Sequence, residues 1–295
     1  MPTPPPGFGQ LGGQAVALGM AGARDLGSCA RRHPELFPAD PFDDRLFTAT
    51  AMANAFGSPW ETAERVRAAA RTSLWVFAAD YLVDYLATTR AEIDDLAAAC
   101  RAVAAGGDPS GVPLAEFLAE LRDDLAAAPA FAAHADAWRD QLDRYFAAMA
   151  REWEWKQAGA DGRPTYEEYL ANADNFGSSL VNIAHWIHTG DAYALAHLDG
   201  LRTVSDAVQR VLRLLNDLAS YRRDLEWGDL NALLLGVTPD QVRARITELA
   251  GEVAAMTARL RPAHPRLADY LDLQVAYSVG FYGHGDYWGT PAEPE

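Results

Sequence analysis

Apolar residues recur at intervals of three and four along nearly the whole chain, and this spacing limits the folds that the chain can adopt. Such spacing places apolar side chains on one face of a helix. It is clearest in five stretches, residues 63–85, 128–155, 201–225, 239–261 and 265–282. Prolines stand at or near several expected helix starts, and alternating patterns typical of strands are essentially absent. The chain is therefore predicted to be all-α.

A chain of 295 residues can form one large helical domain or two small ones. No internal run of proline and glycine marks a linker between two domains. Residues 1–13 differ, because four of the first six residues are prolines, and we expect this segment to be an irregular tail. Residues 14–295 are predicted to form a single helical domain.

The charge balance excludes several classes of partner. The chain has 25 basic and 41 acidic residues, a net charge of −16. Nucleic acid requires a basic footprint and an anionic membrane surface attracts basic segments, so neither partner fits. No apolar run approaches the about 20 residues of a membrane span, and no secretory signal is visible. We therefore expect a soluble cytoplasmic protein, with Cys29 and Cys100 as small core residues.

Asn216, Ser220 and Asp224 stand four residues apart within one expected helix. Each four-residue step turns the helix by only about 40° from its starting face, so the three side chains point the same way. An amide, a hydroxyl and a carboxylate are hard oxygen ligands, suited to Mg²⁺ or Mn²⁺ rather than zinc. Arg222 and Arg223 add permanent positive charge, which a bound phosphate group needs. The alternative is the polar face of an ordinary surface helix.

Asp80 and Asp84 form a second pair at helical spacing, inside an otherwise apolar stretch of residues 74–86. A buried, unpaired carboxylate costs several kcal/mol, so these two need a metal ion, a base or a water-filled cavity. The alternative is that the acidic edge of this helix reaches solvent. Two helices that each present oxygen ligands can face one another in a bundle and hold metal ions between them.

These motifs resemble those of bacterial class I terpene synthases. The triad of Asn216, Ser220 and Asp224 matches the family triad, with Asp in place of the usual final Glu, and residues 228–231 match what commonly follows it. The Asp-rich motif keeps Asp80 and Asp84 but has Tyr81 where a second Asp is usual. The resemblance implies an all-α bundle around a central apolar cavity. It also implies up to three Mg²⁺ ions, with Mn²⁺ as an alternative, held by these five ligands as the catalytic centre.

Two further features of the family are missing. Ala173 and Asp174 stand where an Arg normally senses the diphosphate, and the usual C-terminal Arg-Tyr pair is absent. Arg223 and Arg222 are the nearest candidates to bind the diphosphate instead. These departures indicate a divergent member, of a kind found among bacterial diterpene synthases, and the family resemblance allows a homodimer.

The resemblance also predicts a cavity wall that stabilises a carbocation. Aromatic faces do this without acting as nucleophiles, at about 0.5–2 kcal/mol per contact, while the closed cavity excludes water. A break in the helix near residue 177 would add backbone dipoles. For each aromatic residue the alternative is ordinary core packing. The residues predicted to form this wall are Phe77, Tyr81, Phe176, Gly177, Trp186, Phe281, Tyr282 and Trp288.

The chain is thus predicted to ionise a prenyl diphosphate and cyclise the resulting cation, and geranylgeranyl diphosphate is the favoured substrate. A bicyclic diphosphate of the copalyl type and farnesyl diphosphate remain open. A chain-elongating prenyltransferase would normally show two Asp-rich motifs. A di-iron carboxylate bundle would need Glu-x-x-His pairs, which are lacking. A non-catalytic helical binding protein is the alternative of another class.

Overall fold

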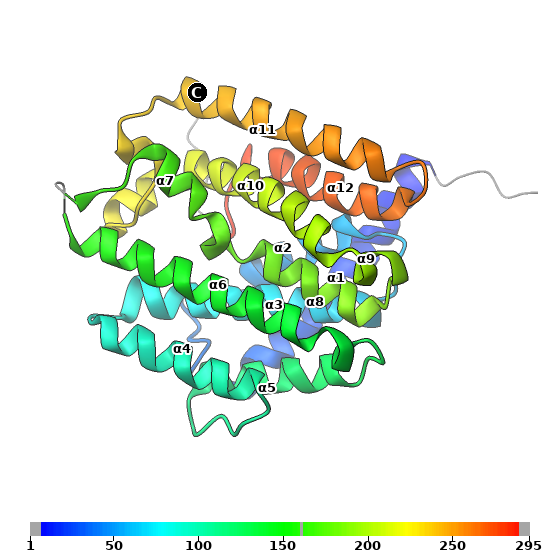
Figure 1. Cartoon of the computed structure of the whole chain (residues 1–295), viewed down its shortest axis with the longest axis horizontal. Coiled ribbons are helices and arrows are strands. Elements are labelled where there is room, and N and C mark those ends of the chain that lie inside the picture. Colours follow the sequence, from blue (N-terminus) through cyan, green and yellow to red (C-terminus); the bar gives the residue numbers. More distant parts are fainter. Residues whose placement is uncertain (1–6, 160–161, 289–295) are drawn as a thin grey trace, which may run out of the picture.

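The computed structural model describes residues 7–159 and 162–288, and this part of the chain consists of helices joined by short connections, without strands. The all-α prediction is confirmed (Figure 1). The α-helices are α1 (Phe8–Arg32), α2 (Asp44–Gly57), α3 (Ala63–Asp80), α4 (Arg90–Ala104), α5 (Pro113–Ala126), α6 (Phe131–Gln157), α7 (Tyr166–Ala171), α8 (Ser178–Thr189), α9 (Ala192–Ala196), α10 (Leu198–Trp227), α11 (Pro239–Leu260) and α12 (Pro265–Tyr282). A π-helical segment follows α3 at Tyr81–Leu86, and short 3₁₀ turns lie at Ala173–Phe176 and Ala232–Leu235.

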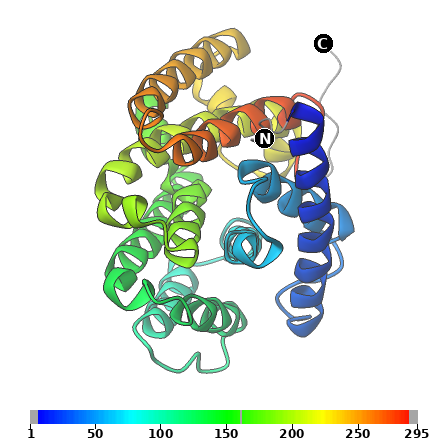
Figure 2. The ribbon, with the colours of Figure 1, turned by 90° about the vertical axis from the view of Figure 1, so that its right-hand side faces the viewer.

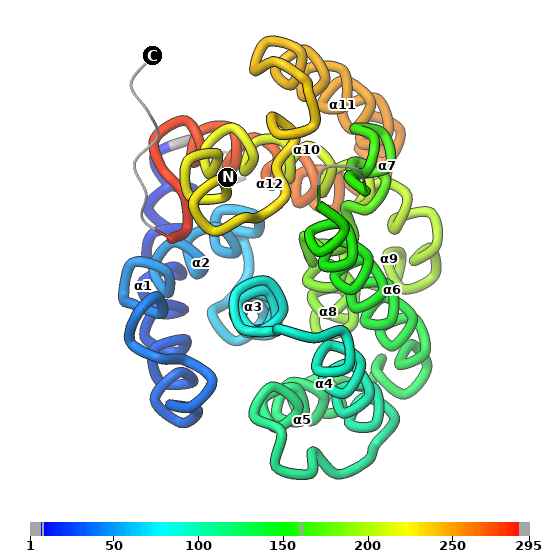
Figure 3. Tube along the Cα trace, turned by 90° about the vertical axis from the view of Figure 1, so that its left-hand side faces the viewer, coloured from blue at the N-terminus to red at the C-terminus, as the bar shows by residue number. Residues whose placement is uncertain are grey.

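Helix α3 lies at the centre of the bundle. Figures 2 and 3 show it nearly end-on, with the other helices arranged around it. It packs against α1, α2, α5 and α8, while α10 packs against α8, α11 and α12. One connected cluster of buried side chains runs from α1 to α12. The central helix can therefore carry a functional group into the interior of the molecule.

Side-chain contacts fix the position of α3. Trp75 is fully buried, and its indole Nε1–H donates to the carbonyl of Leu114 at 3.0 Å. Arg71 donates to both carboxylate oxygens of Asp25 on α1 and to Asp124 on α5, with each N···O distance 2.7 Å. These contacts tie α3 to helices on two sides, so the residues at its C-terminal end have a defined location.

Capping residues explain where several helices begin. The Thr62 hydroxyl accepts from the Arg65 N–H at the start of α3. Thr238 forms a capping box with Gln241, and Pro239 occupies the first position of α11, where a missing N–H costs nothing. Helix α10 ends at Gly228, whose φ of 72° lies in the left-handed region that favours glycine.

Two features of the fold differ from the predictions. Helix α1 begins at Phe8, so the irregular tail expected up to Gly13 is wrong for residues 8–13, while residues 1–6 lie outside the described part. The expected helix over residues 63–85 changes to a π-helix after Asp80. None of the helices in residues 7–159 and 162–288 combines the length and the apolar character needed to span a bilayer.

Candidate active site

The π-helical segment contains Asp84 and follows directly after Asp80, the last residue of α3. The Ala87 N–H donates to the Leu82 carbonyl, five residues earlier, at 2.8 Å. Two side chains of α6 hold this segment, since the Trp153 indole donates to the Ala87 carbonyl at 3.3 Å and Lys156 donates to the Asp84 carbonyl at 3.0 Å. π-Helical turns of this kind are frequent at functional sites.

The predicted triad on α10 converges as expected. The Ser220 hydroxyl lies between the other two members, donating to Asp224 Oδ2 and lying 3.5 Å from Asn216 Oδ1. Asp224 also accepts from the Asn231 amide at 2.9 Å, and the Asn216 amide contacts the Tyr282 hydroxyl at 3.5 Å. Ser220 is fully buried, whereas Asn216 is partly exposed. One group of oxygen atoms therefore lies on one face of α10.

Both motifs meet at one cavity, which is lined mainly by α2, α3, α8, α10 and α12 and has a volume of about 230 Å³. Asp80, Asp84, Asn216 and Asp224 all line it, and Ser220 lies directly behind them through its bond to Asp224. The structure thus brings the Asp-rich segment of α3 and the triad of α10 to the same space, although about 130 residues separate them in the sequence.

The electrostatics of this cavity favour a bound cation. Burial and the nearby charge of Asp229 raise the pKa of Asp80, and burial and the charge of Asp80 raise the pKa of Asp84. Burial also raises the pKa of Asp224, although Arg223 opposes the shift. Carboxylates that repel one another in a low-dielectric site are stabilised by a divalent cation, and every donor here is a hard oxygen. The donor set fits Mg²⁺ or Mn²⁺.

Arg223 lies at this cavity and is already paired. It bonds Asp224 at 3.3 Å and forms an ion pair with Asp286, whose side chain is fully buried. This pair anchors the segment after α12, so that Tyr287 and Trp288 reach the cavity wall. Arg222, the other predicted diphosphate ligand, is exposed and does not line the cavity.

A second arginine, which sequence reasoning missed, occupies the interior. Arg213 bonds both carboxylate oxygens of Glu152 at 2.9 and 2.7 Å, and its guanidinium lies 3.9 Å from the centre of the Tyr169 ring. It also bonds Asn175 in the 3₁₀ turn where the resembling family carries its sensor. Arg213 stands three residues before Asn216, so extending the face of the triad by one turn could have found it.

Two carboxylates of this region were also missed. The Asp217 carboxylate accepts from the Tyr169 hydroxyl at 2.8 Å, and burial raises its pKa to about 7 although Arg213 opposes the shift. Asp229 lines the cavity and pairs with Lys156. Asp217 carries no sequence signal of its own, because it becomes significant only through Tyr169 on α7 and through Arg213. Asp229 lies in the segment 228–231 that resembles the family, but it was not predicted to be a site residue.

Four of the eight predicted wall residues line the cavity: Phe77, Phe176, Tyr282 and Trp288. The ring of Phe77 lies 5.4 Å from that of Trp288 in an edge-to-face arrangement. Aromatic rings that the sequence did not single out join them, namely those of Tyr169, Tyr270, Tyr277 and Tyr287.

The other four predicted wall residues lie behind the wall or beside it. Trp186 is buried in the core with its ring edge-to-face to Tyr270 at 6.3 Å, and Phe281 stacks on Tyr277 at 5.7 Å. Tyr81 stacks on the exposed Tyr85 at 5.2 Å. These three rings therefore pack in the core or at the rim and do not line the cavity. The prediction failed for them because the position of a residue along a helix does not tell whether its ring faces the cavity or packs behind the residues that do.

Gly177 caps the start of α8 and packs against Val76, which itself lines the cavity. The predicted helix break is therefore present beside the wall. The wall is less apolar than expected, because amide and hydroxyl groups also line it: those of Thr50, Asn54, Ser73, Ser178, Asn182, Gln274 and Ser278.

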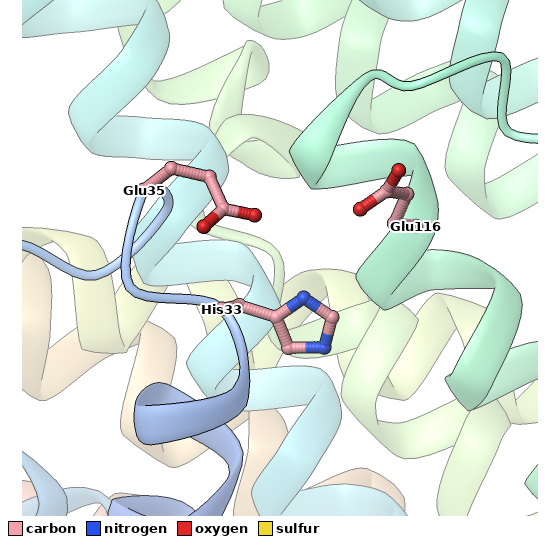
Figure 4. A group of neighbouring side chains, drawn as sticks. All are labelled: His33, Glu35 and Glu116. Atoms are coloured by element: carbon pink, nitrogen blue, oxygen red, sulfur yellow. The ribbon is translucent and has the colours of Figure 1, made fainter.

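A separate group of possible metal ligands lies where the segment after α1 faces α5 (Figure 4). His33, Glu35 and Glu116 each offer one ligand atom, and these atoms lie within 4.8 Å of one another. None of the three lines the cavity, and His33 Nε2 is 2.9 Å from Glu120. This group is distinct from the predicted magnesium site, and any metal-binding measurement has to separate the two.

Comparison with known proteins agrees with this geometry. Residues 71–238 match the family model "Terpene synthase family 2, C-terminal metal binding". Ent-pimara-9(11),15-diene synthase of Streptomyces sp. (strain KO-3988) is 29% identical over 279 residues, which cover 90% of this chain and 91% of that protein.

Solved structures show the same fold. 2-Methylisoborneol synthase from Streptomyces coelicolor A3(2), in complex with Mg²⁺ and geranyl-S-thiolodiphosphate, matches with a TM-score of 0.71 at 16% identity, over 89% of this chain and 90% of that one. Linalool/nerolidol synthase from Streptomyces clavuligerus, in complex with 2-fluorogeranyl diphosphate, matches with a TM-score of 0.61 at 19% identity, over 88% and 93%.

Proposed function

The chain belongs to terpene synthase family 2, and from this membership we propose that it is a diterpene synthase that ionises geranylgeranyl diphosphate and cyclises the carbon chain. The family makes it a class I terpene synthase, a lyase. The observation that carries the proposal is the meeting of two oxygen-ligand motifs, on α3 and α10, at one cavity whose wall also carries aromatic rings.

The proposed roles follow from the positions of the side chains. Asp80 and Asp84 on one side, and Asn216, Ser220 and Asp224 on the other, would hold the Mg²⁺ ions. When bound, Mg²⁺ supplies the positive charge that neutralises the leaving diphosphate. Ser220 orients the other two triad members through its hydrogen bonds, which is a positioning role.

Arg223 would add charge-assisted hydrogen bonds to the diphosphate once it is released from Asp286 or shares its donors with it. The rings of Phe77, Phe176, Tyr282 and Trp288 would face the carbocation, and the segment that carries Trp288 would exclude water. Wall shape would then select the ring closure by holding the chain in one folded conformation.

The C20 substrate is supported by the ent-pimaradiene synthase relative, whose named product is a diterpene. A preformed bicyclic diphosphate of the copalyl type is the second candidate. Farnesyl diphosphate is the third, since the structural matches include synthases of smaller terpenes. These substrates differ in length and rigidity, so one set of assays separates them.

The test is incubation of the purified protein with geranylgeranyl, copalyl and farnesyl diphosphates, with and without Mg²⁺, followed by hydrocarbon extraction and mass spectrometry. We expect a cyclic C20 product that requires Mg²⁺ and disappears in Asp80→Asn and Asn216→Ala. Asp199→Asn is the matched control, because Asp199 lies on the same helix α10 with its side chain 96% exposed. A product from farnesyl diphosphate alone would overturn the C20 assignment.

A non-catalytic binding protein would behave differently in the same assays. It would turn over none of the three diphosphates. A melting temperature unchanged by diphosphate with Mg²⁺ would exclude specific binding as well. With isopentenyl diphosphate added as the C5 donor, a longer linear diphosphate, detected as its alcohol after phosphatase treatment, would instead indicate chain elongation.

A further inference from the structure

Lys156 is the only lysine in a chain that otherwise uses arginine at every basic position, 24 of the 25 basic residues. It lies near the C-terminal end of α6, and its side chain is only 9% exposed. A lysine ammonium is a compact point charge with three rotatable donors, whereas an arginine guanidinium is a planar fork. The single use of lysine therefore occurs at a buried position where these two shapes would behave differently.

All three donors of the ammonium have acceptors in the described structure. Nζ donates to the Asp84 carbonyl at 3.0 Å, lies 3.5 Å from Asp84 Oδ1, and forms a closer ion pair with Asp229. Asp84 belongs to the π-helical segment after α3, and Asp229 follows the end of α10. One ammonium group thus bridges the two elements that carry the predicted metal ligands.

The surrounding charges show what this ammonium balances. Arg213 is paired with Glu152, and Arg223 is paired with Asp224 and Asp286. Within residues 7–159 and 162–288, Lys156 is the base that forms ion pairs with Asp84 and Asp229. Burial lowers the pKa of Lys156, but the attraction of Asp84 and Asp229 outweighs this effect and raises it, so the ammonium is charged.

We propose that Lys156 is an internal counter-ion that holds Asp84 and Asp229 together in the metal-free protein and is displaced from Asp84 when a divalent cation binds. This inference rests on the proposed function, because it takes Asp84 to be a metal ligand. Two cations compete for the same carboxylate, so Lys156 raises the metal concentration at which the site fills. Lys156 also holds the π-helical segment and the residues after α10 next to each other while no metal is bound. Lys156 is in this sense a positioning residue.

The unmodified protein offers a direct test, because a lysine-specific reagent has one side chain to label. We would acetylate the protein with an N-hydroxysuccinimide ester and follow the peptide that contains Lys156 by mass spectrometry. Titration with Mn²⁺ should raise the labelling rate at least about threefold, since the cation displaces the ammonium from Asp84 and leaves Asp229 as its remaining ion-pair partner. Sodium chloride at equal ionic strength is the control and should have a smaller effect. No change, or slower labelling with Mn²⁺, would overturn the proposal.

A second test measures Mn²⁺ affinity from the electron paramagnetic resonance signal of the free ion. Lys156→Met removes the competing charge and should tighten Mn²⁺ binding about tenfold, whereas Lys156→Arg keeps the positive charge in a different shape and should tighten it clearly less. The Glu35→Gln/Glu116→Gln background removes the separate group near His33, so that binding there is not counted. Equal or weaker Mn²⁺ binding by Lys156→Met, with the protein folded by circular dichroism, would make Lys156 a structural ion-pair partner and overturn the proposal.

Labelling in the presence of inorganic diphosphate, without metal, tests whether Lys156 binds diphosphate instead. If diphosphate alone slows the labelling of Lys156, the ammonium is a diphosphate ligand and the counter-ion role is wrong. The two proposals also fail separately. Release of Lys156 by Mn²⁺ without turnover of any prenyl diphosphate would overturn the proposed function alone. Mg²⁺-dependent turnover with a lysine that does not respond to Mn²⁺ would overturn this inference alone.

Discussion

Replacing Gly177 by alanine should disturb both the stability of the protein and the shape of its cavity. Gly177 joins the 3₁₀ turn at Ala173–Phe176 to α8, with φ of 77° and ψ of −4°. A Cβ atom at this position would lie 2.6 and 2.8 Å from the two γ-carbons of Val76 on α3. Val76 lines the cavity beside Phe77, so a shift that relieves this clash would move the wall.

The cost has two parts. The left-handed backbone conformation costs a non-glycine residue about 1–2 kcal/mol. Forcing a methyl group into a packed contact costs a further about 1–3 kcal/mol, because Val76 has a stiff side chain with few alternative rotamers. Gly177→Ala should therefore lower the free energy of unfolding by about 2–5 kcal/mol.

The other end of the same helix provides the control. Gly190 caps the end of α8 with φ of 67°, and a Cβ there would meet no atom within 4 Å. Gly190→Ala should cost only the backbone part, about 1–2 kcal/mol. Val76→Ala in the Gly177→Ala background makes room for the added methyl group and should give a favourable coupling of about 1–2 kcal/mol in a double-mutant cycle.

Urea unfolding of the wild type, the three single variants Gly177→Ala, Gly190→Ala and Val76→Ala, and the double variant gives these differences, and product analysis shows whether the wall has moved. Gly177→Ala should change the ratio of products, whereas Gly190→Ala should not. Equal destabilisation by the two glycine substitutions, together with no coupling to Val76, would refute the reasoning that the contact between α3 and α8 limits this position.

Two further predictions concern stability. Burial, with smaller contributions from His188 and Arg65, lowers the pKa of His185 to about 3, against an ordinary value of 6.5. As the pH falls below 6.5, the imidazole of His185 therefore takes up a proton in the unfolded chain but not in the folded one. Between pH 7 and pH 5 the wild type should lose about 2 kcal/mol more stability than His185→Phe in urea titrations. Equal losses in the two proteins would contradict the lowered pKa of His185. Arg71→Met leaves Asp25 on α1 without this base and leaves Asp124 on α5 with only Arg67 at 3.9 Å, so it should cost about 2–4 kcal/mol, whereas Arg45→Met, whose side chain is 71% exposed, should cost less than about 1 kcal/mol. Similar costs for the two arginines would show that Arg71 does not hold α3.

Helix positions followed from the sequence wherever periodicity and local capping act together. The predicted range of α12, Pro265–Tyr282, agrees with the structure because a proline at the first position fixes its start. The triad on α10 was predictable for a similar reason, since a regular helix converts spacing into direction. The three triad side chains therefore lie on one face of α10, where their spacing placed them.

The π-helix after Asp80 was not predictable in this way. Its extra residue per turn is stabilised by partners far away in the sequence, including the Trp153 indole and the Lys156 ammonium on α6. The same applies to Arg213, which becomes part of the site through Glu152 and Tyr169. Long-range partners of this kind leave no local pattern, so a single sequence shows the helix but not the register of its last turn.

Asn182 is a polar group of the cavity wall whose hydrogen bonds make it compatible with the proposed carbocation chemistry. Asn182 uses all four of its hydrogen-bonding positions: its amide donates to Ser205 at 2.9 Å and contacts Gln274 Oε1 at 3.4 Å, while its oxygen accepts from Tyr270 at 2.8 Å and from Gln274 at 2.9 Å. An oxygen whose two lone pairs are occupied is a poor nucleophile toward a cation and a poor site for a water molecule that would quench it. At Asn182, the presence of an amide oxygen therefore overstates the reactivity of the wall toward the proposed carbocation, and loss of the Tyr270 or the Gln274 donor would free a lone pair of that oxygen at the cavity.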